Sequence, residues 1–157
     1  MCKSIVKKFC GLFSKTNTPK NKYILVVDDS ELERRFYCKT LRKAGYDVQS
    51  VRDGVSAIKE MEDRYPDLVI SDLAMPGMNG KEFCQRVKNN EQTEKIPFMF
   101  LTGSAAPGEV VECFEAGGEF YLEKPIDART LVRQVSNIFN DLEQEILSSR
   151  DIGESGV

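Results

Sequence analysis

The sequence predicts an α/β fold, an open and doubly wound parallel sheet of five strands with five helices on its two faces. From residue 23 onward, short apolar runs alternate with segments of helical periodicity, and the loops between them are only a few residues long. The apolar runs are also nearly continuous, which is typical of parallel strands buried on both faces. With 157 residues, of which 41% are hydrophobic, the chain can form one cored domain with extensions.

Five segments have the length and composition of strands, and each is followed by polar or turn-forming residues. The strands are predicted at residues 23–27, 47–51, 68–71, 97–101 and 120–122. The loop at 73–80, after the third strand, contains Pro76, Gly77 and Gly80, which disfavour regular structure.

Each strand is followed by a predicted helix. Ser30 can cap the first helix and Gly45 can end it. Four apolar residues of this helix are expected to face the sheet: Leu32, Phe36, Leu41 and Ala44. Further helices are predicted around residues 53–65, after Gly80, at 107–116 and from Asp127. The expected inward residues of these helices are Ala57, Ile58 and Met61, then Phe83 and Val87, and finally Leu131, Val135, Ile138 and Leu142.

Polar side chains capable of handling a phosphoryl group stand at the ends of four predicted strands. Asp28 and Asp29 follow the first strand, Asp72 the third, Thr102 the fourth and Lys124 the fifth. In an open parallel sheet these carboxyl ends share one edge, where ligands bind. Converging carboxylates repel one another unless a cation or protons intervene, and oxygen ligands of this kind suit Mg²⁺.

Four motifs together resemble the receiver domain of two-component response regulators. They are "VVDDS" (26–30), "PDLVISDLAMPGMNG" (66–80), "LTGSA" (101–105) and "YLEKP" (121–125), and the resemblance covers residues 23–141. It implies a CheY-like, flavodoxin-like sheet with strand order 2-1-3-4-5.

The resemblance also implies the roles of individual residues. Asp72 would accept a phosphoryl group from a histidine of a sensor histidine kinase or a histidine phosphotransfer protein. The Mg²⁺ ion would be held by Asp29, Asp72 and the backbone carbonyl of Ala74, with Asp28 acting through water. Thr102 and Tyr121 would form the switch pair, and Lys124 would pair with the phosphoryl group and precede a cis peptide bond to Pro125. The small residues Ala74 and Ser104 stand where such domains tune the lifetime of the phosphoryl group.

The letters Gly-Gly-Glu-Phe at 117–120 match the signature of cyclases that join two GTP molecules. Too few residues follow Phe120 to form a nucleotide-binding domain, and they are needed to complete the receiver fold. We therefore interpret the match as a loop between a helix and a strand. Phe120 itself stands where many dimerising receivers carry an acid, and strand alternation leaves two interpretations open, an exposed aromatic contact or a core residue.

Composition excludes several other functions. The chain has no histidine, so it offers neither a Ser-His nor a Cys-His nucleophile, and a zinc site has few ligands to draw on. Its five cysteines are scattered, which suggests reduced thiols and a cytoplasmic location. No apolar run is long enough to span a membrane. The net charge is −3 although residues 1–22 contain six lysines and no acid, so the rest of the chain is acidic, which argues against non-specific nucleic-acid binding.

The two ends lie outside the predicted receiver domain. Residues 1–22 contain six lysines and no acid, and Ile5, Phe9, Leu12 and Phe13 have helical spacing. This pattern has two interpretations: a solvated tail, which we favour, or an amphipathic helix through which residues 1–15 make peripheral contact with the inner membrane face. Residues 142–157 are expected to lengthen the last helix and end as a tail.

The sequence therefore predicts a stand-alone response regulator that signals through changed contacts with a downstream protein. It would not be an enzyme, except that it catalyses its own phosphorylation and dephosphorylation. Two alternatives remain. A small phosphohydrolase of the haloacid-dehalogenase kind also uses an aspartate and Mg²⁺, but it needs Asp-x-Asp after its first strand, whereas Asp28 and Asp29 are adjacent. The other is a receiver-like interaction module that is never phosphorylated.

Overall fold

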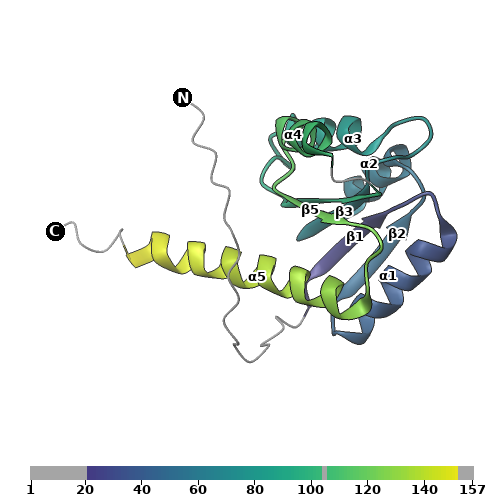
Figure 1. Ribbon diagram of the computed structural model, residues 1–157. Coiled ribbons are helices and arrows are strands. Elements are labelled where there is room, and N and C mark those ends of the chain that lie inside the picture. Colours follow the sequence, from purple (N-terminus) through teal and green to yellow (C-terminus); the bar gives the residue numbers. More distant parts are fainter. Residues whose placement is uncertain (1–20, 104–105, 152–157) are drawn as a thin grey trace.

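The apolar segments form one sheet of five parallel strands in the order β2-β1-β3-β4-β5, which confirms the predicted topology (Figure 1). The computed structural model describes residues 21–103 and 106–151. The strands are β1 (Tyr23–Val27), β2 (Asp47–Val51), β3 (Leu68–Asp72), β4 (Phe98–Thr102) and β5 (Phe120–Glu123). Strand order reverses between β1 and β3, because the chain passes from β1 to β2 on one side and returns to β3 on the other.

Five helices cover the two faces of this sheet. They are α1 (Glu31–Lys43), α2 (Gly54–Asp63), α3 (Gly80–Lys88), α4 (Pro107–Glu115) and α5 (Ala128–Asp151). Helices α1 and α5 cover one face, and α2, α3 and α4 cover the other (Figure 1). The side chains between each layer and the sheet form two separate apolar cores.

Strand β1 explains why the central strands have no polar alternation. Ile24 and Val26 belong to the core under α1 and α5, and Leu25 and Val27 belong to the core on the opposite face. All four side chains are fully buried. A strand covered on both faces needs apolar residues at every position, as the sequence pattern indicates.

The predicted inner face of α1 is wrong at two positions. Leu32 is 80% exposed and Phe36 is 39% exposed, whereas Leu41 is buried as expected. Tyr37 and Cys38 pack beside Leu41 in their place. Phe36 and Leu41 are five residues apart, which is about 140° around a helix of 3.6 residues per turn, so they cannot share one face.

Helix α5 begins and packs as predicted and then continues beyond the sheet. Its first turn is capped by Asp127, whose Oδ1 accepts a hydrogen bond from the backbone N–H of Thr130 at 2.9 Å. Its predicted inward residues are buried or packed against the core: Leu131, Val135, Ile138 and Leu142. The helix then extends past the sheet to Asp151 (Figure 1).

The predicted amphipathic segment at residues 1–15 lies outside the described residues. None of the helices described within residues 21–103 and 106–151 has the length and apolar character that a membrane span requires.

The Gly-Gly-Glu-Phe segment ends α4 and starts β5. Gly117 has a φ of 101°, a conformation that glycine adopts without strain. The N–H of Gly117 donates to the carbonyl of Phe114, and the N–H of Gly118 donates to that of Cys113. These two bonds form a Schellman motif, a common way to end a helix.

The other two residues of this segment, Glu119 and Phe120, also have structural roles. Glu119 pairs with Lys88 at 2.5 Å and accepts a hydrogen bond from the N–H of Phe98 at 2.8 Å. Phe120 is partly buried and packs against the core under α1 and α5, which favours the second interpretation of this residue. A helix end, an ion pair and a core contact therefore account for all four residues.

We predict that Gly118→Ala destabilises the fold by about 1–3 kcal/mol, as overpacking of a core does. A methyl group at this position would lie 2.3 Å from Cε2 of Phe100, whose ring is fully buried, and 3.2 Å from the carbonyl of Cys113. Gly108→Ala is the matched control, because its new methyl group would have no atom within 4 Å apart from its chain neighbours and the backbone of its own helix. The free energy of unfolding from urea titration measures both changes. Equal stability of the two variants would contradict the packing argument.

Candidate phosphoryl and metal site

The register of β1 and β3 brings the predicted acidic residues together. Val27 pairs with Ser71, so the next residues, Asp28 and Asp72, lie beside each other on adjacent strands. Asp28 is completely buried and Asp72 is 7% exposed, whereas Asp29 is exposed. This is the edge of the sheet at which strand order reverses, where open α/β sheets bind their ligands.

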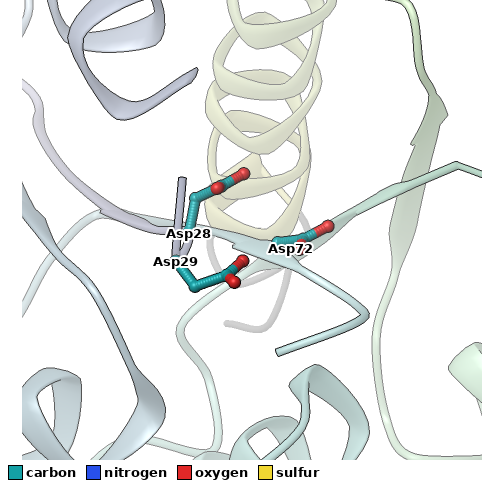
Figure 2. A group of neighbouring side chains, drawn as sticks. All are labelled: Asp28, Asp29 and Asp72. Carbon is teal, nitrogen blue, oxygen red and sulfur yellow. The ribbon is translucent and has the colours of Figure 1, made fainter. Parts of the chain in front are cut away.

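Three carboxylates form a candidate cation site at this edge. Asp28, Asp29 and Asp72 each offer a ligand oxygen, and these oxygens all lie within 4.8 Å of one another. Figure 2 shows the side chains directed into one common space. Carboxylate oxygens are the ligands that Mg²⁺ prefers, so the residues present fit this ion.

Lys124 enters the same site from the end of β5. Its Nζ lies 3.1 Å from Oδ2 of Asp28 and 3.1 Å from Oδ1 of Asp72. It also donates to Oε2 of Glu33 on α1 at 2.5 Å. An ammonium group has three N–H donors, and here three carboxylates surround it.

Burial and charge shift the pKa values of these groups. Burial raises the pKa of Asp28 to about 6, although the N–H of Ser30 and the Lys124 ammonium oppose the change. Burial also raises the pKa of Asp72, against the hydrogen bond from Lys124. For Lys124, burial would lower the pKa, but hydrogen bonds to Glu33 and Asp72 outweigh it and raise the pKa. The metal-free site therefore retains an ammonium and disfavours full ionisation of its carboxyls.

The backbone around Asp28 is held by several hydrogen bonds. Its Oδ1 accepts from the N–H of Ser30 at 2.8 Å, and its carbonyl accepts from Nη1 of Arg34 at 2.6 Å. Its own N–H donates to the carbonyl of Val51 at 3.2 Å. These contacts fix Asp28 between β1, β2 and the first turn of α1.

The backbone of Asp72 is fixed by the loop that follows it. The N–H of Leu73 donates to Leu101, and the N–H of Gly80 donates back to Leu73, both at 2.9 Å. A Cβ on Gly80 would lie 2.4 Å from the carbonyl oxygen of Asp72, so only glycine fits here without displacing Asp72. Ala74, two residues beyond Asp72, is exposed in this loop, and its role as a carbonyl ligand stays a prediction.

Thr102 and Tyr121 lie on neighbouring strands, and their switch role stays a prediction. Thr102 is buried, and its Oγ1 donates to Oε2 of Glu109 on α4 at 3.2 Å. Tyr121 is 43% exposed, and its ring meets that of Phe114 edge-on, with centroids 6.2 Å apart. The Lys124–Pro125 peptide bond is cis, as the resemblance to receiver domains implies. Ser104 lies outside the described residues.

Glu33 is the site residue that sequence reasoning missed. "SELE" (30–33) has the spacing of a capping box, in which a glutamate bonds back to the N–H of the capping residue. Ser30 does accept from the N–H of Glu33, at 3.4 Å, but Asp28 already binds the N–H of Ser30. Asn79 and Glu82, by contrast, form the complete box at α3. The acidic pair Asp28-Asp29 directly before this Ser-x-x-Glu segment was the signal that could have identified Glu33.

Comparisons with known proteins agree with the fold. The family model of the response regulator receiver domain matches residues 24–136. The chain is 32% identical to chemotaxis protein CheY-3 of Vibrio cholerae over 124 residues, which cover 78% of this chain and 95% of that protein. It is 26% identical to the polar-differentiation response regulator DivK of Brucella ovis, over 76% of this chain and 98% of that protein.

Solved structures show the same relationship. The chemotaxis response regulator CheY4 of Vibrio cholerae has a TM-score of 0.73 at 32% identity and covers 76% of this chain and 99% of its own. The receiver domain of sensor histidine kinase PA1611 from Pseudomonas aeruginosa, solved with a magnesium ion coordinated in its active site cleft, has a TM-score of 0.69 at 28% identity, over 74% of this chain and 96% of its own. Motifs, strand order and family match thus agree that the chain belongs to the response regulator receiver domain family of two-component signalling.

Proposed function

We propose that the protein accepts a phosphoryl group from phosphohistidine onto Asp72 and signals through changed protein contacts. In this step an oxygen of the Asp72 carboxylate forms a bond to phosphorus, the phosphorus–nitrogen bond breaks, and the imidazole nitrogen retains the electron pair and takes up a proton. The observation that carries the proposal is the position of Asp72, within reach of both Lys124 and two further aspartates at one sheet edge.

Each of the surrounding side chains has a role in this reaction. Lys124, 3.1 Å from Asp72, can donate to an oxygen of the incoming phosphoryl group. Asp28, Asp29 and Asp72 would hold Mg²⁺, with the carbonyl of Ala74 as a further ligand. When bound, the ion would neutralise phosphoryl oxygens as charge redistributes during transfer. Thr102, on the neighbouring strand, would donate its hydroxyl to the same group, and Tyr121 would follow its movement.

Two exposed apolar patches offer surfaces for protein partners. Leu32 and Phe36, one turn apart on α1, are exposed near the N-terminal end of this helix, close to Glu33. We assign this patch to the histidine kinase or phosphotransfer protein, which must approach Asp72. Val111, Phe114 and Tyr121 form the second exposed patch, on α4 and β5, and we assign it to the downstream target. Neither assignment involves nucleic acid.

The same geometry weighs against the alternative functions. A haloacid-dehalogenase-like hydrolase would turn over phosphate monoesters, whereas a receiver takes up one phosphoryl group and catalyses only its own phosphorylation and dephosphorylation. The two aspartates at the end of β1 are adjacent, and the proposed nucleophile is on β3. An interaction module that is never phosphorylated would have no need for a partly buried lysine among carboxylates, since such a cluster costs stability.

We expect Asp72→Asn to abolish phosphorylation by acetyl phosphate in the presence of Mg²⁺, because the amide cannot act as the nucleophile. Intact-protein mass spectrometry should show a single added phosphoryl group in the wild type and none in the variant. Asp63→Asn, at the exposed end of α2, is the matched control and should label normally. A chelator should prevent labelling of the wild type. Labelling of the Asp72→Asn protein would show that another residue is the acceptor.

We also expect Mg²⁺ binding to tighten as pH rises through about 6. The pKa of Asp28 is raised to about 6, so this carboxyl is largely protonated at pH 5 and ionised at pH 7.5. One competing proton with such a pKa weakens cation binding about tenfold at pH 5 relative to pH 7.5. Isothermal titration calorimetry at both pH values measures the change, and Asp28→Asn should remove most of it. Equal affinities at the two pH values would contradict the assignment to Asp28.

A further inference from the structure

Glu33 makes the shortest contact of the Lys124 ammonium. Its Oε2 lies 2.5 Å from Nζ, compared with 3.1 Å for Asp28 and 3.1 Å for Asp72. Within the described part of the chain, the carboxylates grouped closely enough to hold a metal ion are Asp28, Asp29 and Asp72, and Glu33 is not among them. Glu33 therefore touches the lysine from outside the candidate metal site.

The first turn of α1 leaves the Glu33 side chain available for this contact. In a complete capping box the glutamate would bind the N–H of Ser30. Asp28 binds that N–H at 2.8 Å, and Glu33 binds Lys124 instead. Asp28 thus accepts the hydrogen bond that the glutamate accepts in a complete capping box, and it shares the lysine with Glu33.

The two other partners of Lys124 are candidate metal ligands. A divalent cation that binds Asp28 and Asp72 draws on the same oxygens that now accept from Nζ. Without a third partner the ammonium would have to compete with the cation for these carboxylates or lose its ion pairs in a half-buried position. Glu33 gives Lys124 a partner that the cation does not take.

We propose that Glu33 is a positioning residue that holds and neutralises the Lys124 ammonium beside Asp72, which leaves the three aspartates to the divalent cation. This inference rests on the proposed function, because it assumes that the aspartates bind Mg²⁺. It assigns separate tasks to the four acidic side chains: three face the cation, and the fourth faces the ammonium. Lys124 then remains within reach of Asp72 when the phosphoryl group arrives.

The first test compares Mg²⁺ binding to the unphosphorylated wild type, Glu33→Gln and Glu31→Gln by isothermal titration calorimetry. Glu31 lies in the same first turn of α1 and pairs with Arg35 at 3.4 Å on the exposed side of the helix. It therefore controls for net charge and for the helix dipole. We expect Glu33→Gln to weaken Mg²⁺ binding about tenfold, as an unneutralised ammonium beside the cation should, and Glu31→Gln to remain within about twofold of the wild type.

A second test asks whether Glu33 acts through Lys124. In a Lys124→Met background the competing ammonium is absent, so Glu33→Gln should cause less than half of its original loss, measured on a logarithmic scale. An equal loss in both backgrounds would mean that Glu33 acts only as a nearby charge, and would overturn the proposal. Because Lys124→Met removes three ion pairs, its fold is checked by circular dichroism.

A spectroscopic measurement keeps the proposal testable if Lys124→Met does not fold. The ζ-ammonium resonance of Lys124, observed by ¹⁵N NMR with saturating Mg²⁺, should be protected from exchange in the wild type and lost in Glu33→Gln. Retention of this signal in Glu33→Gln would overturn the proposal.

The outcomes separate the two levels of inference. Absence of Mg²⁺ binding to the wild type would refute the proposed function and this inference together. Normal binding to the wild type, with Glu33→Gln equal to Glu31→Gln, would refute the role of Glu33 alone.

Discussion

Repulsion among carboxylates at one edge of the sheet is the constraint on which the site depends. Three acidic side chains surround a single ammonium, Asp29 lies beside two of them, and Asp28 and Asp72 are almost completely buried. Such a cluster lowers stability, because desolvation and like charges both disfavour ionisation. The raised pKa values of Asp28 and Asp72 express this cost. A fold retains such a cluster only if its two apolar cores offset the loss.

The parallel topology brings the three aspartates and Lys124 to the same edge of the sheet, because each of them lies at or just after the carboxyl end of a strand. Strands β1 and β3 are adjacent although β2 separates them along the chain, so their carboxyl ends coincide. Strand β5 returns at the far side of β4, and the N–H of Lys124 donates to the carbonyl of Thr102 at 2.7 Å. Groups that are distant in sequence therefore meet because of backbone pairing, and the side chains need only be long enough to reach.

The sequence predicted the parts of the fold that depend on hydrophobic periodicity and on the residues at the strand ends. Asp28, Asp29, Asp72 and Lys124 were found because a residue type and a strand terminus coincide. The inner face of α1 was not found, since Leu32 and Phe36 are apolar and periodic yet exposed. Glu33 was not found either, because Ser30 and Glu33 have the spacing of a helix-capping box. Both misses occur where tertiary contacts compete with a local pattern, and hydropathy or spacing alone cannot tell which prevails.

The position of Lys124 also connects the site to the outer surface. Lys124 follows β5 directly, and Tyr121 on the same strand contacts Phe114 of α4 at the exposed face. Under the proposed function, phosphorylation replaces a carboxylate partner of Lys124 with a group of greater negative charge, so the distribution of ion pairs around its ammonium must change. The N–H of Lys124 is bonded to Thr102, whose hydroxyl binds Glu109 on α4. Under the same proposal, a change at the ammonium would act on the backbone that joins β4, β5 and α4, the elements that carry the exposed aromatic pair. A partner that binds one arrangement of that pair better than another would respond to phosphorylation of Asp72 without contacting Asp72.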